Sequence, residues 1–135
     1  MKIQIQQHDY ALTITDQLVT IIQTELAKVN MDISDGVTLN FKDPDYSAEA
    51  GGYHPVEICI NKEGLIQYVT DFAYVGSGYF AELVKELDFD FSLGLLQQFG
   101  REFPIEQAYE LFPIWQKNFC AYYQQGIFTV TVSSL

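Results

Sequence analysis

Alternating apolar and polar residues dominate the middle of the chain and limit the folds open to it. A period of two is typical of β-strands that bury one face. Four segments have this strand character, at residues 37–41, 56–60, 65–75 and 79–91. The connections between the last three are short, and Gly64 suits a turn with positive φ. Because short connections join antiparallel neighbours, the sequence predicts an antiparallel sheet.

An amphipathic helix is predicted before these strands, from about Asp16 to Asn30. Its apolar positions recur at helical spacing: Leu18, Ile22, Leu26 and Val29. Thr15 is a suitable N-cap for this helix. Further toward the N-terminus, Ile3 and Ile5 alternate with polar residues, which predicts a weak first strand.

The C-terminal third changes from strand to helix periodicity. Between Ser92 and Gly100 we expect a short helix, and Pro104 suits the first turn of a longer one. The longer helix has an apolar stripe: Ile105, Ala108, Phe112, Trp115, Phe119 and Tyr122. Pro113 interrupts the stripe, so we expect a kink or break there. A glycine then ends the helix, and Ile127–Val132 reads as a last strand.

This order of elements indicates a single α+β domain that spans residues 1–135. Its antiparallel sheet is flanked by an N-terminal helix and C-terminal helices, packed against one face so that the other face is partly wet. The candidate wet, acidic face belongs to the fourth strand segment: Glu82, Glu86, Asp88 and Asp90.

The net charge of −11 restricts the partners that the protein can bind. An acidic surface repels phosphates, so we expect no nucleic acid and no anionic membrane as partner. A protein partner with a basic surface is compatible with this charge. Acidity that serves solubility alone is the simpler explanation.

The cysteines and the N-terminus indicate a cytoplasmic protein. Cys59 and Cys120 each lie in an apolar pattern, so we interpret both as free, buried thiols in a reducing compartment. The first ten residues lack the apolar core of a signal peptide. No apolar run approaches the roughly 20 residues that span a bilayer.

The long connection from Phe41 to Glu57 is the candidate functional segment. Connections of this length inside compact domains are often functional. Its candidate site residues are three carboxylates and one histidine: Asp43, Asp45, Glu49 and His54. His54 with Asp43 or Asp45 could form an acid–base pair, although a loop histidine satisfied by the backbone is the simpler interpretation.

Neither a metal site nor a cofactor is predicted. The loop begins like a calcium loop, but Ala48 and His54 occupy the positions that need glycine and glutamate, so a turn at Asp43–Asp45 is favoured. The two cysteines and two histidines lack the paired spacing of zinc ligands. Gly51-Gly52 lacks the spacing of a phosphate-binding loop.

Aromatic residues are abundant, at 15% of the chain. The only tryptophan, Trp115, lies in the middle of the C-terminal stripe, and we expect it to be mostly buried and structural. The chain also has nine tyrosines, whose hydroxyl groups need partners. Several should therefore lie at a rim or an interface, and we expect a homo-oligomer.

The block DPDYSAEAGGYHPVEI, from Asp43 to Ile58, resembles a family of short uncharacterised proteins of gamma-proteobacteria, some encoded on genomic islands. That family has no assigned catalytic residues. The resemblance implies a fold like that of the acidic mitochondrial matrix proteins that double as receptors for the globular heads of a complement component. Those proteins have a twisted antiparallel sheet with terminal helices and form rings. This chain is shorter, lacks a targeting presequence and ends in a strand-like segment.

Two functions remain open from the sequence. The first is a non-catalytic, homo-oligomeric protein-interaction module, which fits the acidic charge and the tyrosine content. The alternative is a small enzyme or small-ligand-binding cup, with His54 and the loop acids at its mouth. A deep apolar pocket next to His54 would favour the alternative, whereas a flat acidic sheet face would favour the interaction module.

Overall fold

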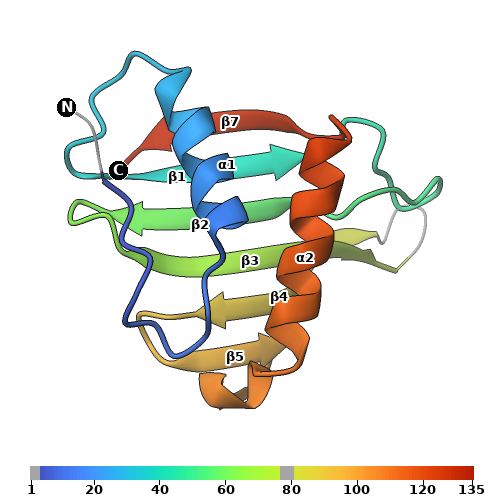
Figure 1. Ribbon diagram of the computed structural model, residues 1–135. Coiled ribbons are helices and arrows are strands. Elements are labelled where there is room, and N and C mark those ends of the chain that lie inside the picture. Colours follow the sequence, from blue (N-terminus) through green and yellow to red (C-terminus); the bar gives the residue numbers. More distant parts are fainter. Residues whose placement is uncertain (1–3, 77–80) are drawn as a thin grey trace.

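Seven strands form one antiparallel sheet, and both helices lie on the same face of it (Figure 1). The computed structural model describes residues 4–76 and 81–135. The strand order is β6-β5-β4-β3-β2-β1-β7. The elements in chain order are α1 (Asp16–Ala27), β1 (Gly36–Lys42), β2 (Val56–Asn61), β3 (Ile66–Val75), β4 (Glu82–Asp90), β5 (Leu95–Gln98), β6 (Arg101–Pro104), a 3-10 helix (Ile105–Ala108), α2 (Leu111–Gln124) and β7 (Thr129–Ser134). The predicted α+β class is confirmed.

The core lies between the sheet and the two helices. Strand alternation turns Val37, Leu39 and Phe41 of β1 toward the helices, and each is 0% exposed. The ring of Phe41 meets that of Phe119 on α2 edge to face, with 5.0 Å between ring centroids. Each large apolar side chain buried in this way contributes roughly 1.5–3 kcal/mol to folding. This packing fixes α2 against the inner face of the sheet.

The N-terminal segment packs as irregular chain. Residues 4–7 form no strand, so the predicted first strand is wrong over that described part, and Ile3 lies outside the described residues. The segment instead buries Ile14 in the core and is held by Gln116 of α2. The Gln116 side chain accepts a hydrogen bond from the Thr15 backbone N–H and donates one to the Thr13 carbonyl, both at 3.1 Å. Two alternating residues were too short a pattern to indicate this tertiary attachment.

The predicted elements in the first half are largely confirmed. Thr15 caps α1 and accepts a hydrogen bond from the Leu18 N–H, although α1 ends at Ala27 rather than Asn30. The strands predicted at 37–41, 56–60 and 65–75 are β1, β2 and β3, and Gly64 turns with a φ of 84°. The turn predicted at 76–78 and the start of the next strand fall partly on residues 77–80, which lie outside the described residues.

The helix predicted between Ser92 and Gly100 is wrong. This stretch forms a turn, β5 and a two-residue turn that leads into β6. Phe99 and Gly100 in the turn both have positive φ, of 47° and 83°. Two-residue hairpin turns favour positive φ at both positions. Gly100 therefore marks a hairpin turn rather than the end of a helix. Leu96 is buried in the core, and it lies on a strand.

The C-terminal apolar stripe is divided between two helices, and the break between them lies before Pro113 rather than at it. A 3-10 helix covers Ile105–Ala108, and α2 begins at Leu111 after two non-helical residues. Pro113 lies in the first turn of α2, where a backbone N–H has no intrahelical partner. The proline therefore fits the helix start, and the expected kink within a longer helix is not formed. Gly126 ends α2 with a φ of 74°, as expected.

A register shift between β3 and β4 changes which way the acidic residues point. Asp71 pairs with Leu87, but the next β3 residue, Phe72, pairs with Lys85. Glu86 is therefore the extra residue of a β-bulge, and the alternation of faces along β4 is interrupted there.

The four predicted acids do not form one exposed acidic face. Glu86 turns toward His54 and is 2.8 Å from it. Asp88 is 4% exposed and accepts a hydrogen bond of 2.9 Å from the hydroxyl of Thr70. Asp88 precedes the core-facing Phe89, and consecutive strand residues point to opposite faces, so Asp88 lies on the sheet face away from the helices. It is nevertheless buried rather than exposed to solvent. The prediction of a wet face made by Glu82, Glu86, Asp88 and Asp90 is wrong, because it assumed unbroken alternation.

Both cysteines are free and buried, as predicted. Burial raises the pKa of the Cys120 thiol to about 11. Within the two described ranges, neither helix combines the length and the hydropathy needed to span a membrane.

Replacing Asp88 by Asn tests the cost of its buried charge. Burial raises the pKa of Asp88, against the opposing effects of the Thr70 hydrogen bond and Lys85. A carboxyl with a raised pKa favours the folded state at low pH, and this contribution is lost as pH rises through the folded-state pKa. The free energy of unfolding of Asp88→Asn, relative to the parent, should therefore increase between about pH 3 and about pH 7 in urea titrations. The exposed Asp45→Asn is the control, and an equal pH dependence in both variants would contradict the assignment.

Candidate functional site

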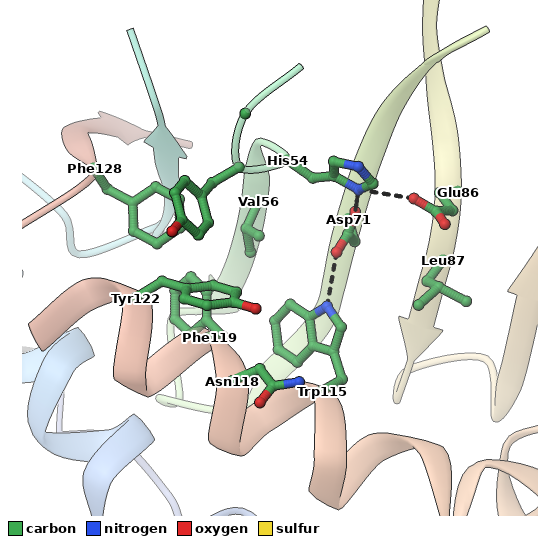
Figure 2. A pocket seen from close by; sticks show the side chains of 12 residues that line it. His54, Val56, Asp71, Glu86, Leu87, Trp115, Asn118, Phe119, Tyr122 and Phe128 are labelled. Carbon is green, nitrogen blue, oxygen red and sulfur yellow. Dashed lines mark hydrogen bonds and ion pairs between the residues drawn. The ribbon is translucent and has the colours of Figure 1, made fainter. Parts of the chain in front are cut away.

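A pocket of about 410 Å³ lies beside His54, between α2 and the helix-facing side of β3 and β4 (Figure 2). The segment before β2 and the residues after α2 close its other sides. Its lining residues are Gly52, Tyr53, His54, Val56, Asp71, Glu86, Leu87, Trp115, Asn118, Phe119, Tyr122 and Phe128. The pocket therefore combines residues from five separate parts of the chain.

One end of the pocket is polar and holds three groups in close contact. The Nδ1 atom of His54 lies 2.9 Å from Asp71 Oδ1 and 2.8 Å from Glu86 Oε2. The indole N–H of Trp115 donates a hydrogen bond of 2.8 Å to the other oxygen of Asp71, Oδ2. Figure 2 shows Asp71 between the histidine and the indole. We call His54, Asp71 and Glu86 the acidic–histidine cluster.

The cluster has more acceptors than its one donor can serve. Nδ1 carries at most one hydrogen, and the geometry forms a hydrogen bond to Asp71 but not to Glu86. Glu86 Oε2 is a buried atom without a hydrogen-bond partner among the described residues. No lysine or arginine of the described chain lines the pocket. The polar end is therefore anionic and incompletely satisfied.

Burial acts directly on Asp71. Its side chain is 13% exposed, and desolvation raises the pKa of the carboxyl. Hydrogen bonds from Trp115 and His54 lower the pKa but do not cancel the effect of burial. A carboxylate held in this way gains from any cation that reaches it.

The other end of the pocket is aromatic. Trp115 and Phe119 stack with ring centroids 5.2 Å apart and an interplanar angle of 7°. Tyr53 and Tyr122 contact each other with centroids 4.6 Å apart. The side chain of Phe128 completes this wall (Figure 2). Flat apolar groups could pack against it.

The local sequence explains how these side chains meet. Trp115, Phe119 and Tyr122 recur at four and three residues, so they share one face of α2. The β-bulge lets the consecutive residues Glu86 and Leu87 both line the pocket, although consecutive strand residues normally face opposite ways. Bulges often redirect side chains beside active sites.

The predicted loop residues separate into two groups. His54 lines the pocket, but its partners are Asp71 and Glu86, so the pairing with Asp43 or Asp45 is wrong. Asp43 is instead used within the loop, where it is 7% exposed. Its carboxylate accepts hydrogen bonds from the N–H groups of Asp45, at 2.9 Å, and of Tyr53, at 3.1 Å.

The turn favoured at Asp43–Asp45 is thereby confirmed. Tyr46 adds a backbone hydrogen bond to the Asp43 carbonyl. Asp45 and Glu49 are exposed on the loop and do not line the pocket. Asp43 thus holds the loop that leads to His54, and none of the three loop acids lines the pocket.

Sequence reasoning missed Asp71, assigned Glu86 to the wrong face and did not predict the contact between Trp115 and Asp71. Asp71 could have been identified as a candidate from the sequence, because it is a charged residue inside a largely apolar strand. Glu86 was assigned to a surface face. Trp115, expected to be structural, is half-buried and donates to Asp71.

Adding a methyl group at Gly52 should disrupt the mouth of the pocket. Gly52 has a φ of 130°, and a Cβ there would lie 2.9 Å from Asp43 Oδ2 and 3.1 Å from the Tyr46 Cα. Gly51, with a φ of 70°, has nothing within 4 Å of such a Cβ. Gly51→Ala should cost about 1 kcal/mol of unfolding free energy and Gly52→Ala clearly more. Equal losses in chemical denaturation would show that the loop relaxes around Gly52.

Comparison with known proteins supports the expected fold. The hypothetical protein VC0508 from the VSP-II pathogenicity island of Vibrio cholerae is similar at 33% identity, with a TM-score of 0.81, over 96% of this chain and 100% of that one. The hypothetical protein VC1805 from pathogenicity island VPI-2 of Vibrio cholerae is similar at 35% identity, with a TM-score of 0.79, over 93% and 98%. The latter is described as sharing structural homology with the human P32 protein.

These findings confirm the resemblance to genomic-island proteins. Among curated protein sequences, none is similar enough to this chain to count as a match. Residues 16–133 match the family described as "Protein of unknown function (DUF2787)". The chain belongs to the DUF2787 family.

Proposed function

We propose that the protein binds a small organic ligand that has a flat apolar body and a cationic head group. The observation that carries this proposal is the two-ended pocket: an aromatic wall beside an anionic end that lacks a basic residue. A deep apolar pocket next to His54 was the feature expected to favour ligand binding, and the observed pocket lies beside His54 but has one polar end. A volume of about 410 Å³ lies within the range of small-molecule sites.

The aromatic wall would hold the body of the ligand. Trp115, Phe119 and Tyr122 present ring faces or edges, and rings stack in offset or edge-to-face arrangements. Such contacts contribute roughly 0.5–1.5 kcal/mol each beyond the burial of apolar area. A planar ligand would use more of this wall than a flexible aliphatic one.

The acidic–histidine cluster would hold the head group. Asp71 and Glu86 bring two carboxylates to the same end of the pocket, and Glu86 Oε2 lacks a donor. An ammonium head supplies both hydrogen-bond donors and positive charge, and charge-assisted hydrogen bonds are the stronger kind. A carboxylate head would add a third negative charge and should be rejected.

Trp115 makes this proposal directly testable. It is the only tryptophan of the chain and lines the pocket, so its fluorescence reports on occupancy. We expect saturable changes with phenethylamine, weaker ones with phenethyl alcohol and none with phenylacetate, in buffer that contains a chelator. The three probes share a phenyl ring with a two-carbon side chain and differ in the polar group at its end, the second carbon of phenylacetate being the carboxyl carbon.

Matched variants distinguish binding in the pocket from non-specific attraction of the amine to the acidic surface. Glu86→Gln keeps the size of the side chain and should weaken phenethylamine binding about tenfold, roughly 1.4 kcal/mol. Glu63→Gln, an exposed acid in the turn between β2 and β3, should bind like the parent. Equal affinity in all three proteins, or no saturable signal with any probe, would reject the proposal.

Protein interaction is a second candidate, and Phe99 is the observation that favours it. This residue is 58% exposed at the tip of the β5–β6 hairpin and has a φ of 47°. A bulky residue with positive φ stores strain of about 1–3 kcal/mol, and strained residues concentrate at functional sites. A second copy of the chain, or a partner with a basic surface, would bury the ring.

Phe99→Asn tests that candidate. Asparagine accepts positive φ more readily, so the variant should be as stable as the parent or more stable in thermal unfolding. If Phe99 joins copies of the chain, Asn should shift the sedimentation of the protein toward the monomer. A parent that is already monomeric at tens of micromolar, roughly where a standard-size interface holds, would count against this candidate.

A further inference from the structure

We propose that the acidic–histidine cluster is a binding site for one divalent first-row transition-metal ion. His54 Nδ1, an oxygen of Asp71 and an oxygen of Glu86 would be its ligands. The inference rests on the proposed function, since it names the cation that the anionic end of the pocket takes. It departs from the expectation of no metal site, which considered only cysteines, histidines and a calcium-loop pattern along the chain.

The spacing of the three ligand atoms fits a single ion. All three lie within 4.8 Å of one another, and Nδ1 is 2.9 Å and 2.8 Å from the two oxygens. Transition metals bind nitrogen and oxygen ligands at about 2.0–2.2 Å. Adjacent ligands around such an ion are separated by about 3 Å in octahedral geometry, from the same bond lengths. Small side-chain adjustments would therefore suffice.

The unmatched acceptors point to the same conclusion. A neutral imidazole with its proton on Nδ1 serves one carboxylate, and with its proton on Nε2 it faces both oxygens with a lone pair. Glu86 Oε2 remains buried without a hydrogen-bond partner, although the Glu86 side chain as a whole is 28% exposed. A metal ion would bind all three atoms at once and neutralise both carboxylates.

Trp115 holds Asp71 in a suitable orientation. Its indole N–H donates to Oδ2, so Oδ1 stays directed at His54. Metal-ligating carboxylates are commonly fixed by such outer hydrogen bonds, which tune affinity. The cluster borders the pocket, so the ion would keep open positions toward it. A head group that coordinates metal could then replace water there.

The ligand set indicates which metals would bind. One imidazole and two carboxylates suit zinc, manganese, iron or cobalt. Magnesium and calcium prefer oxygen ligands alone. We therefore expect Zn²⁺ to bind more tightly than Mg²⁺.

Calorimetric titration of the metal-stripped full chain with ZnCl₂ and MgCl₂ tests the inference. We expect one Zn²⁺ per chain, with Mg²⁺ binding weaker. His54→Ala and Glu86→Gln should each weaken Zn²⁺ binding at least about tenfold, by the range seen when metal sites lose supporting groups. His8→Ala and Glu63→Gln are matched controls that should bind like the parent, because His8 is the only other histidine and both residues are exposed.

Nuclear magnetic resonance gives a readout at the ligand itself. Zn²⁺ should shift the ¹⁵N resonance of His54 Nδ1 and leave the His8 ring nitrogens unchanged. Zinc that binds equally to His54→Ala and to the parent, or that shifts His8 instead, would show adventitious binding to acidic surface and overturn the inference.

Competition with phenethylamine separates the failure of this inference from that of the proposed function. Zn²⁺ that displaces the amine and creates affinity for phenylacetate, which the metal-free protein should not bind, would support the metal site. Amine binding that zinc leaves unchanged would overturn the metal site and leave the ligand pocket standing. Zinc binding that depends on His54 and Glu86, in a protein that binds none of the three organic probes, would support the metal site and reject the ligand pocket.

Discussion

The carboxylate of Asp71, on the largely apolar inner face of the sheet, is the constraint on which the rest of the site depends. A buried carboxylate is destabilising unless it is paired, and here burial raises its pKa despite two hydrogen bonds. An apolar side chain at this position would have packed against α2 without that cost. Trp115 and His54 are oriented by Asp71, one from the helix and one from the loop. Perturbed groups in a concave site concentrate at functional positions, which supports function as the reason for keeping the carboxylate.

The β-bulge at Glu86 supplies the second carboxylate. With regular alternation, Glu86 would share the outer face with Asp88, and the pocket would hold one acid instead of two. The extra residue turns Glu86 inward while Leu87 keeps its inward position. The same shift brings Lys85 to 3.7 Å from Asp88 on the outer face. One backbone irregularity therefore determines the charge of the pocket.

The sequence predicted the fold better than the site, for a physical reason. Strand and helix periods are local, so β1, β2, β3, α1 and the end of α2 could be predicted, and so could the turn closed by Asp43. The hairpin at Phe99-Gly100 was missed because a glycine also ends helices, and only pairing with β4 distinguishes the two. His54 was singled out and does line the pocket, but its partners come from β3 and β4. Pairing register and a bulge decide that contact, and neither is encoded in spacing along the chain.

The sheet itself holds the acidic–histidine cluster in place. His54 precedes β2, Asp71 lies on β3 and Glu86 on β4, and these strands are neighbours in the sheet. Next to the cluster, the Phe72 N–H donates a hydrogen bond of 2.9 Å to the Pro55 carbonyl, which fixes the backbone that carries His54. Sites on paired strands are positioned more accurately than sites on free loops. The cluster exists only when β2, β3 and β4 are paired, so a cation that binds it favours the folded chain over the unfolded one. The stability of the folded chain and the binding of a cation to the cluster are therefore linked, because both require the same three strands to be paired.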